Sequence, residues 1–119
     1  MVVLICGSRN WNKPERIAEE LLKLHTTNLV SLIIEGEAHG ADKQGRAAAE
    51  GLGIEVKPFP AAWSQYGKAA GHIRNQQMLA EGKPDYCLAF HEDITNSKGT
   101  KDMLKRLDKA NVPYLLFDK

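Results

Sequence analysis

Short apolar segments alternate along the chain with longer segments in which apolar residues recur at helical spacing. Five apolar segments are rich in branched or aromatic residues and have the length of strands. The first, second and fourth are apolar enough to be buried on both faces of a parallel sheet. The pattern therefore predicts five strands, at residues 2–6, 31–35, 54–59, 86–90 and 114–117.

The segments between the predicted strands each carry one apolar or small-residue face, which predicts four helices. The first follows the start signal Asn12-Lys13-Pro14, with Asn12 as the expected cap and Pro14 near the first turn. The second has a face of small residues that would let it pack close to the sheet. In chain order the four faces are Ile17, Leu21 and Leu24; Ala41, Gly45, Ala48 and Leu52; Ala70, Ile73 and Gln77; and Met103, Leu107 and Ala110.

This alternation of strand and helix is typical of a doubly wound α/β domain, in which right-handed crossovers place helices on both faces of a parallel sheet. A chain of 119 residues can bury one core but is too short for two ordinary domains, so we expect a single domain over residues 1–119. The connection at 60–71 is long and carries aromatic residues and glycines. Connections of this kind are often functional.

Composition and charge narrow the function classes. Sixteen Lys and Arg against fifteen Asp and Glu give a net charge of +1, so no overall field draws the chain to nucleic acid or an anionic membrane. No segment approaches the roughly 20 apolar residues that span a bilayer, and the amino terminus lacks the pattern of a signal peptide, so we expect a cytoplasmic protein. The histidines and cysteines lack metal-binding spacing, and Cys6 and Cys87 are interpreted as buried, reduced thiols. We expect neither a metal nor a separate cofactor.

Glycines follow three of the predicted strands, at the edge where an open α/β sheet binds its ligands. They are Gly7 after the first strand, Gly36 and Gly40 after the second, and Gly99 after the fourth. If the strand order is 3-2-1-4-5, the first and fourth strands flank the point where the order reverses, and these loops meet in one crevice. There Ser8 and Arg9 would supply hydrogen-bond donors, whereas Trp11 is expected to pack in the core.

The loop ahead of the fourth helix is a candidate phosphate site. Gly99 and Thr100 would present backbone N–H groups and the positive end of the helix dipole to an anion, and Gly99 would let the backbone approach it closely. The alternative is that Ser97 or Thr100 simply caps the helix.

The loop after the second strand offers acceptors for sugar hydroxyls. Glu37 and Asp42 lie beside glycines, and carboxylates accept hydrogen bonds from the hydroxyl pair of a ribose. The alternative is that Asp42 only suits the helix dipole and that Glu35 and Glu37 are solvated.

Residues 72–78 open the third predicted helix and include Arg74 and Asn75. A guanidinium forms two parallel hydrogen bonds to a phosphate or carboxylate, and Trp63 or Tyr66 in the preceding connection could stack on a base. The alternative is a surface arginine with two half-buried aromatic residues.

Taken in order, four blocks of the chain resemble the SLOG superfamily of Rossmann-like domains, and within it the small YspA-like proteins. The blocks are residues 7–11, 35–42, 61–78 and 89–100, and the third, AAWSQYGKAAGHIRNQQM, is the specific one. The resemblance implies a three-layer α/β/α fold with a five-stranded parallel sheet of order 3-2-1-4-5 and a pocket for a nucleotide or nucleotide-derived ligand. Members include LOG-type phosphoribohydrolases, sensor domains for ADP-ribose-like signals and the DNA-processing protein A family, and they commonly self-associate.

The chain departs from the hydrolase branch of this superfamily at two positions. That branch carries an Arg-Lys-x-x-Met block, which Arg74 and Met78 match while Asn75 replaces the lysine. Its Pro-Gly-Gly-x-Gly-Thr-x-x-Glu block is matched by Gly99 and Thr100, but Met103 stands where the glutamate would be. The resemblance assigns that glutamate to the ribose during cleavage, so Glu92 or Asp93 would have to supply the acid from another direction.

We therefore favour a domain that binds a nucleotide-derived phosphate and ribose over two alternatives. The first alternative is a phosphoribohydrolase or N-glycosidase with Arg74, Glu92 and Asp93 as catalytic residues. The second is DNA binding through the lysines of the fourth helix, where the interspersed Asp102 and Asp108 favour a solvated face instead. We expect a small-molecule partner and no membrane, and the resemblance adds self-association.

Overall fold

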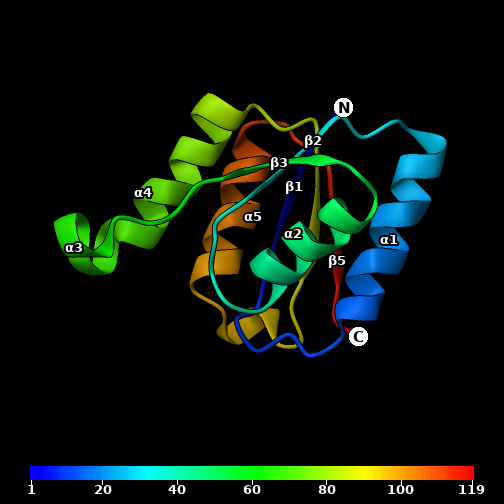
Figure 1. Ribbon diagram of the computed structural model, residues 1–119. Coiled ribbons are helices and arrows are strands. Elements are labelled where there is room, and N and C mark those ends of the chain that lie inside the picture. Colours follow the sequence, from blue (N-terminus) through cyan, green and yellow to red (C-terminus); the bar gives the residue numbers. More distant parts are fainter.

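Five parallel strands form one sheet at the centre of the protein. The computed structural model describes all 119 residues. The strands are β1 (Val2–Gly7), β2 (Leu32–Glu35), β3 (Glu55–Pro58), β4 (Tyr86–Phe90) and β5 (Tyr114–Phe117). Their order is β3-β2-β1-β4-β5, and every neighbouring pair is parallel (Figure 1). The predicted Rossmann-like sheet is confirmed.

Helices cover both faces of the sheet and complete three layers (Figure 1). One face is covered by α1 (Pro14–Thr27) and α2 (Ala41–Gly51). The other is covered by α4 (Ala70–Gln77), its continuation η2 (Met78–Gly82) and α5 (Gly99–Lys109). Three short pieces complete the chain: α3 (Trp63–Tyr66), η1 (Gly67–Ala69) and η3 (Ile94–Asn96). Figure 1 shows α3 at the outer end of α4, away from the sheet.

Two apolar cores lie on opposite faces because successive side chains of a strand point to opposite sides. Along β1, Val3 and Ile5 pack in the core under α1 and α2, whereas Leu4 and Cys6 pack in the core under α5. Cys6 and Cys87 are buried free thiols whose Sγ atoms lie 3.7 Å apart, as expected for buried cysteines. Burial raises the pKa of the Cys87 thiol well above its ordinary value.

The second helix packs as closely as its small residues predict. A Cβ atom on Gly45 would lie 2.5 Å from Cγ2 of Ile5, so only glycine fits at this crossing. Ala41 and Ala49 are buried beside it, Ala48 is half-buried, and Leu52 lies past the end of the helix and is exposed.

Besides the placement of Leu52, three details of the predicted helices were wrong. The α1 helix begins at Pro14 after Lys13, and no side chain caps it, so Asn12 is not the cap. In α4 the predicted face is exposed at Ile73 and Gln77, because the buried side includes Asn75, and apolar periodicity does not register its polar contact with Asp102 of α5. At the end of α5, Ala110 is exposed since the helix stops at Lys109.

The strand order places the β1 and β4 ends at the topological switch point. The chain leaves β1 toward one edge of the sheet and leaves β4 toward the other, so the two connecting loops separate and open a crevice. No helix in the structure combines the length and the apolar character needed to cross a membrane.

Candidate functional site

A cavity of about 520 Å³ lies beyond the carboxyl ends of β1 and β4. Its volume falls within the range of roughly 300–1,000 Å³ common for small-molecule sites. The predicted site residues that line it are Gly7, Ser8, Arg9, Asp42, Trp63, Arg74, Asn75, Glu92, Asp93, Gly99 and Thr100. Gly36 and Glu37 instead line an adjoining cavity of about 270 Å³, and Gly40 and Tyr66 line neither. We call the larger cavity the crevice and the smaller one the side pocket.

The turn after β1 is held by its backbone. A side chain at Gly7 would overlap the carbonyl oxygen of Phe90, so glycine lets β1 turn tightly against β4. The Ser8 N–H donates to that same oxygen at 2.8 Å, and the Ser8 hydroxyl donates to Oε1 of Glu92 at 2.8 Å. Both donors of Ser8 are used within the protein, and a phosphate would reach the hydroxyl only by displacing Glu92.

Gly40 joins two loops rather than facing the crevice. Its φ of 79° lies in the left-handed region, and a Cβ there would overlap the backbone of Ser8 and Arg9. The next residue, Ala41, donates its N–H to the Ser8 carbonyl oxygen at 3.0 Å. Gly40 therefore lets the start of α2 pack against the loop after β1. It contacts the backbone of Ser8 and Arg9, and these two residues line the crevice.

Arg74 reaches from α4 across the crevice to the loop after β2. Its Nη1 donates to the carbonyl oxygen of Gly36 at 2.5 Å, and its Nε donates to Oδ1 of Asn75 at 3.1 Å. The remaining nitrogen, Nη2, makes no hydrogen bond within the protein, so it is the part of the guanidinium that an anion can use.

Asp42 is the buried acid of the crevice. It stands in the first turn of α2 with 6% of its surface exposed, and its Oδ2 accepts a hydrogen bond from the Ala38 N–H at 3.2 Å. Burial raises the pKa of Asp42 to about 6, although the charges of Arg74 and Arg9 and the backbone hydrogen bonds oppose the rise. A carboxyl with this pKa changes charge near neutral pH.

Glu35 is not solvated, contrary to one reading of the sequence. It ends β2 with none of its surface exposed. Oε2 accepts from the Glu37 N–H at 2.5 Å, whereas Oε1 has no partner. Burial raises the pKa of Glu35 to about 8, so the group is protonated at neutral pH.

Glu37 is half-buried at the side pocket and paired with a cation. Arg46 donates from Nη1 to Oε1 of Glu37 at 2.6 Å. The neighbouring Glu35 carboxyl and this arginine lower the pKa of Glu37. Glu37 is therefore an ionised acceptor, as binding to a hydroxyl requires.

The start of α5 opens onto the crevice. The Thr100 N–H donates to Oγ of Ser97 at 3.1 Å, so the capping interpretation is correct for Ser97. The first N–H groups of a helix have no acceptor inside it, which leaves Gly99 to face an incoming anion. No atom lies within 4 Å of the Cβ position of Gly99, so the approach to its backbone is open.

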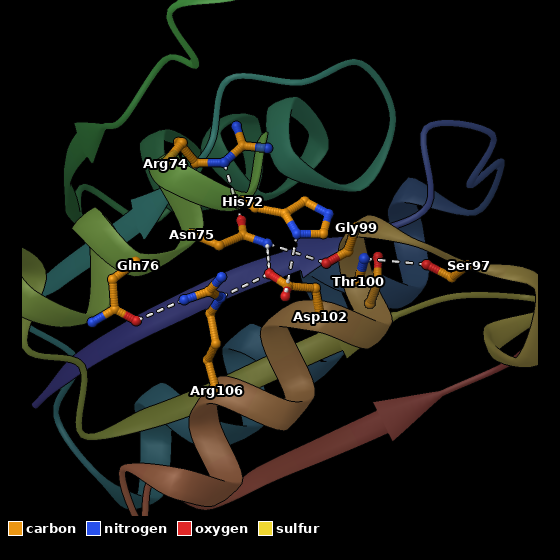
Figure 2. Close-up of polar contacts among 9 residues, drawn as sticks. All are labelled: His72, Arg74, Asn75, Gln76, Ser97, Gly99, Thr100, Asp102 and Arg106. Atoms are coloured by element: carbon orange, nitrogen blue, oxygen red, sulfur yellow. Dashed lines mark hydrogen bonds and ion pairs between the residues drawn. The ribbon is translucent and has the colours of Figure 1, made fainter. Parts of the chain in front are cut away.

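Asn75 links the two walls of the crevice (Figure 2). Its Nδ2 donates to the Gly99 carbonyl oxygen at 3.2 Å and to Oδ2 of Asp102 at 3.1 Å, while its Oδ1 accepts from Arg74. Asp102 also accepts from Arg106 at 2.8 Å. Partial burial works against ionisation of Asp102, but the hydrogen bonds from Arg106 and Asn75 outweigh it and lower the pKa. All polar atoms of the Asn75 amide are thus used to position Arg74 against α5.

The two acids proposed for catalysis are exposed and ionised. A hydrogen bond from its own N–H, together with one from Ser8, lowers the pKa of Glu92. Hydrogen bonds from Asn96 and Thr95 lower the pKa of Asp93. Both carboxylates can accept hydrogen bonds at neutral pH, but neither is suited to donate a proton. Met103, at the position of the hydrolase glutamate, is buried at the floor of the crevice.

The aromatic residues separate into core and surface. Trp11 is buried and packs on Phe90 with ring centroids 5.6 Å apart, so its interpretation as a core residue is confirmed. Trp63 is 48% exposed, and the guanidinium carbon of Arg9 lies 5.5 Å from its ring centroid. Tyr66 is similarly exposed and faces neither cavity.

Sequence reasoning missed several residues that line the crevice, chiefly Asn10, Lys68 and His72. His72 could have been found, since it precedes Asn75 by three residues and the two therefore share a helix face. Its Nδ1 lies 3.5 Å from Oδ1 of Asp102 (Figure 2).

Known proteins resemble the chain over much of its length. Residues 1–66 match the profile of the YAcAr family, described as the YspA, cpYpsA-related SLOG family. The Gene 61 protein of Mycobacterium phage D29 is 35% identical over 121 residues, which cover 97% of this chain and 94% of that protein. No solved structure matches the chain at a significant level. A crevice at the switch point of a β3-β2-β1-β4-β5 sheet and a family match over more than half of the chain lead to one conclusion: this protein belongs to the YspA, cpYpsA-related SLOG family.

Proposed function

We propose that the crevice binds a nucleotide or nucleotide-derived ligand through its phosphate and ribose. Membership of a SLOG family indicates a ligand related to nucleotides. The observation that carries the proposal is that Arg74 and the open start of α5 at Gly99 line the same cavity. A free guanidinium nitrogen and a helix N-terminus are the groups that proteins use for phosphate oxygens.

Each group in the crevice has a role in this proposal. The phosphate lies between Nη2 of Arg74 and the Gly99 N–H, and Arg9 supplies a second positive charge from the β1 loop. Asp42 or Glu37 accepts hydrogen bonds from the ribose hydroxyls, because both lie on the β2 side of Arg74.

An unbiased experiment tests the proposal first. The purified protein is denatured, and the released small molecules are identified by mass spectrometry, with denatured Arg74→Gln protein as the matched control. We expect a nucleotide-derived compound in the wild type and a reduced amount in the variant. If nothing is retained, a thermal-shift screen follows, since a ligand at 100 times its Kd adds ~2.7 kcal/mol of stability. Absence of any shift with mononucleotides, dinucleotides and ADP-ribose would contradict the proposal.

A second candidate function is cleavage of an N-glycosidic bond in the same crevice. Asp42 is the observation that favours it, because a buried carboxyl with a pKa of about 6 can exchange a proton near neutral pH. Among the acids of the crevice, this property distinguishes Asp42 from Glu92 and Asp93. Arg74 would hold the phosphate, and Asp42 would act on the ribose or the leaving base.

The two candidate functions are separated by product analysis. The protein is incubated with nucleoside monophosphates, NAD and ADP-ribose, and free base is measured by chromatography. Release of base by the wild type, with loss of release in Asp42→Asn, would establish the hydrolase. Binding of a compound without release of its base would leave the binding function alone.

A further inference from the structure

The side pocket opens off the crevice at the Arg9, Trp63 and Arg74 side chains. These three residues line both cavities, so they form the boundary between the two spaces. The side pocket has a volume of about 270 Å³ and lies between the loop after β2 and the connection after β3. A ligand whose phosphate is bound at Arg74 therefore has a second space directly beside it.

Trp63 presents an aromatic ring at this boundary. Trp63 is the first residue of α3, and 48% of its surface is exposed. The guanidinium carbon of Arg9 lies 5.5 Å from the centroid of its ring. Arg9 makes no hydrogen bond or ion pair with any other side chain of the protein. Cation–π contacts at exposed sites are weak, so a better partner for either group can separate them.

A nucleobase is such a partner for Trp63, and a phosphate is such a partner for Arg9. Bases stack on aromatic rings through their π-faces, and a guanidinium binds phosphate by charge-assisted hydrogen bonds. Pro60 and Ala61 line the side pocket next to the ring and give it an apolar edge. The side pocket thus offers a base an apolar edge beside the Trp63 ring.

We propose that Trp63 is the stacking platform for the base of the ligand, that the base occupies the side pocket, and that its binding moves Arg9 from the ring to the phosphate. The inference rests on the proposed function and narrows it: the ligand carries a base as well as a sugar phosphate. In the ligand-free protein Arg9 occupies the platform.

The experiment compares two probes that differ only in the base, adenosine 5′-monophosphate and ribose 5-phosphate. The protein has two tryptophans, Trp11 and Trp63. In the variant Trp11→Phe the only indole reports on the platform, and Trp11 itself is buried away from both cavities. We expect adenosine 5′-monophosphate to quench this emission by stacking on the ring. Ribose 5-phosphate can at most draw Arg9 away from the ring, so it should not quench the emission, while both probes bind by calorimetry.

The variant Trp63→Leu provides the matched control and keeps the test independent of how well Trp11→Phe folds. Loss of one base–aromatic stack should weaken adenosine 5′-monophosphate about tenfold or more and leave the affinity for ribose 5-phosphate unchanged. The emission of the remaining Trp11 should not respond to either probe. The same tenfold loss for both probes would show that Trp63 holds the pocket together instead of the base.

The outcomes distinguish this inference from the proposed function. If adenosine 5′-monophosphate binds the wild type but neither quenches Trp63 nor loses affinity in Trp63→Leu, the platform is wrong and the phosphate site stands. If neither probe binds the wild type, and dinucleotides and ADP-ribose also leave its melting temperature unchanged, the proposed function fails and the inference fails with it.

Discussion

Arg74 donates a hydrogen bond of 2.5 Å from Nη1 to the carbonyl oxygen of Gly36, which ties α4 to the loop after β2. The two residues are 38 positions apart in the chain. A Cβ atom at Gly36 would overlap this guanidinium and would lie 2.8 Å from Oδ2 of Asp42. Glycine is thus required for the two charged groups of the crevice to approach the same backbone position.

We expect Gly36→Ala to weaken ligand binding by displacing the Arg74 guanidinium from the crevice. The Arg74 guanidinium is at the end of a flexible side chain, so it can move away from the new methyl group without a change in the fold. Calorimetry with adenosine 5′-monophosphate should show a loss of about tenfold, the size of one charge-assisted hydrogen bond to phosphate. The matched control is Gly51→Ala, since no atom lies within 4 Å of the Cβ position of Gly51. Equal affinities of the two variants would contradict the role assigned to Gly36.

We expect anion binding to tighten as the pH falls through 6, because protonation of Asp42 removes a negative charge beside Arg74 and Arg9. ADP-ribose is the suitable probe, as its diphosphate keeps its charge over this range. A shift of one unit in the pKa of Asp42 on binding corresponds to a change of about tenfold in affinity between pH 5 and pH 8. Asp42→Asn should reduce this pH dependence. Identical pH profiles for the variant and the wild type would exclude Asp42 as its source.

We expect the stability of the protein to fall with rising pH because of Glu35. Its pKa is about 8 in the folded protein against an ordinary value of 4.5, so the folded state binds a proton that the unfolded state has released between these values. The proton-linked stability is complete below pH 4.5 and is lost by pH 8, a change on the order of a few kcal/mol that the lowered pKa of Glu37 partly offsets. Urea unfolding at pH 5, 6.5 and 8 should show a smaller change in Glu35→Gln than in the wild type. If the free energy of unfolding of Glu35→Gln changed more steeply with pH than that of the wild type, Glu35 would not be the source of the pH dependence.

The sheet and most of the helices could be predicted because each is specified by local apolar patterning. The predicted strand at 31–35 is β2 at Leu32–Glu35, and the predicted strands at 86–90 and 114–117 have the bounds of β4 and β5. The face of α4 could not be found in this way. Its buried positions include Asn75, whose partner Asp102 lies 27 residues further on, and apolar periodicity carries no information about polar contacts between helices.

The location of the crevice was predictable from the loops that follow β1 and β4, but the contacts of individual residues were not. A glycine in a loop shows that a side chain is absent. It does not show which atoms occupy the space that the side chain would fill. At Gly36 a guanidinium fills it, at Gly40 the backbone of Ser8 and Arg9 fills it, and at Gly99 it is open. In the same way, the sequence did not reveal that Glu35 is buried and protonated, because a carboxyl at the end of a strand is usually solvated.

Asn75 is a positioning residue, and the variant Asn75→Asp tests this with almost no change of shape. The new carboxylate keeps an acceptor for Arg74 Nε but replaces the Nδ2 donor, so it faces Oδ2 of Asp102 and the Gly99 carbonyl oxygen without a proton between them. We expect a loss of roughly 2–4 kcal/mol in the free energy of unfolding at pH 7, because the variant places a new buried charge against a second carboxylate and a carbonyl oxygen. Since protonation of the introduced carboxyl restores a donor, part of this loss should be recovered at pH 5.

Gln77→Glu makes the same chemical change on the exposed side of α4 and should stay within about 0.5 kcal/mol of the wild type. Urea unfolding of the three proteins at both pH values decides the matter: a variant at position 75 as stable as the one at position 77 would mean that the amide does not link Arg74 to α5.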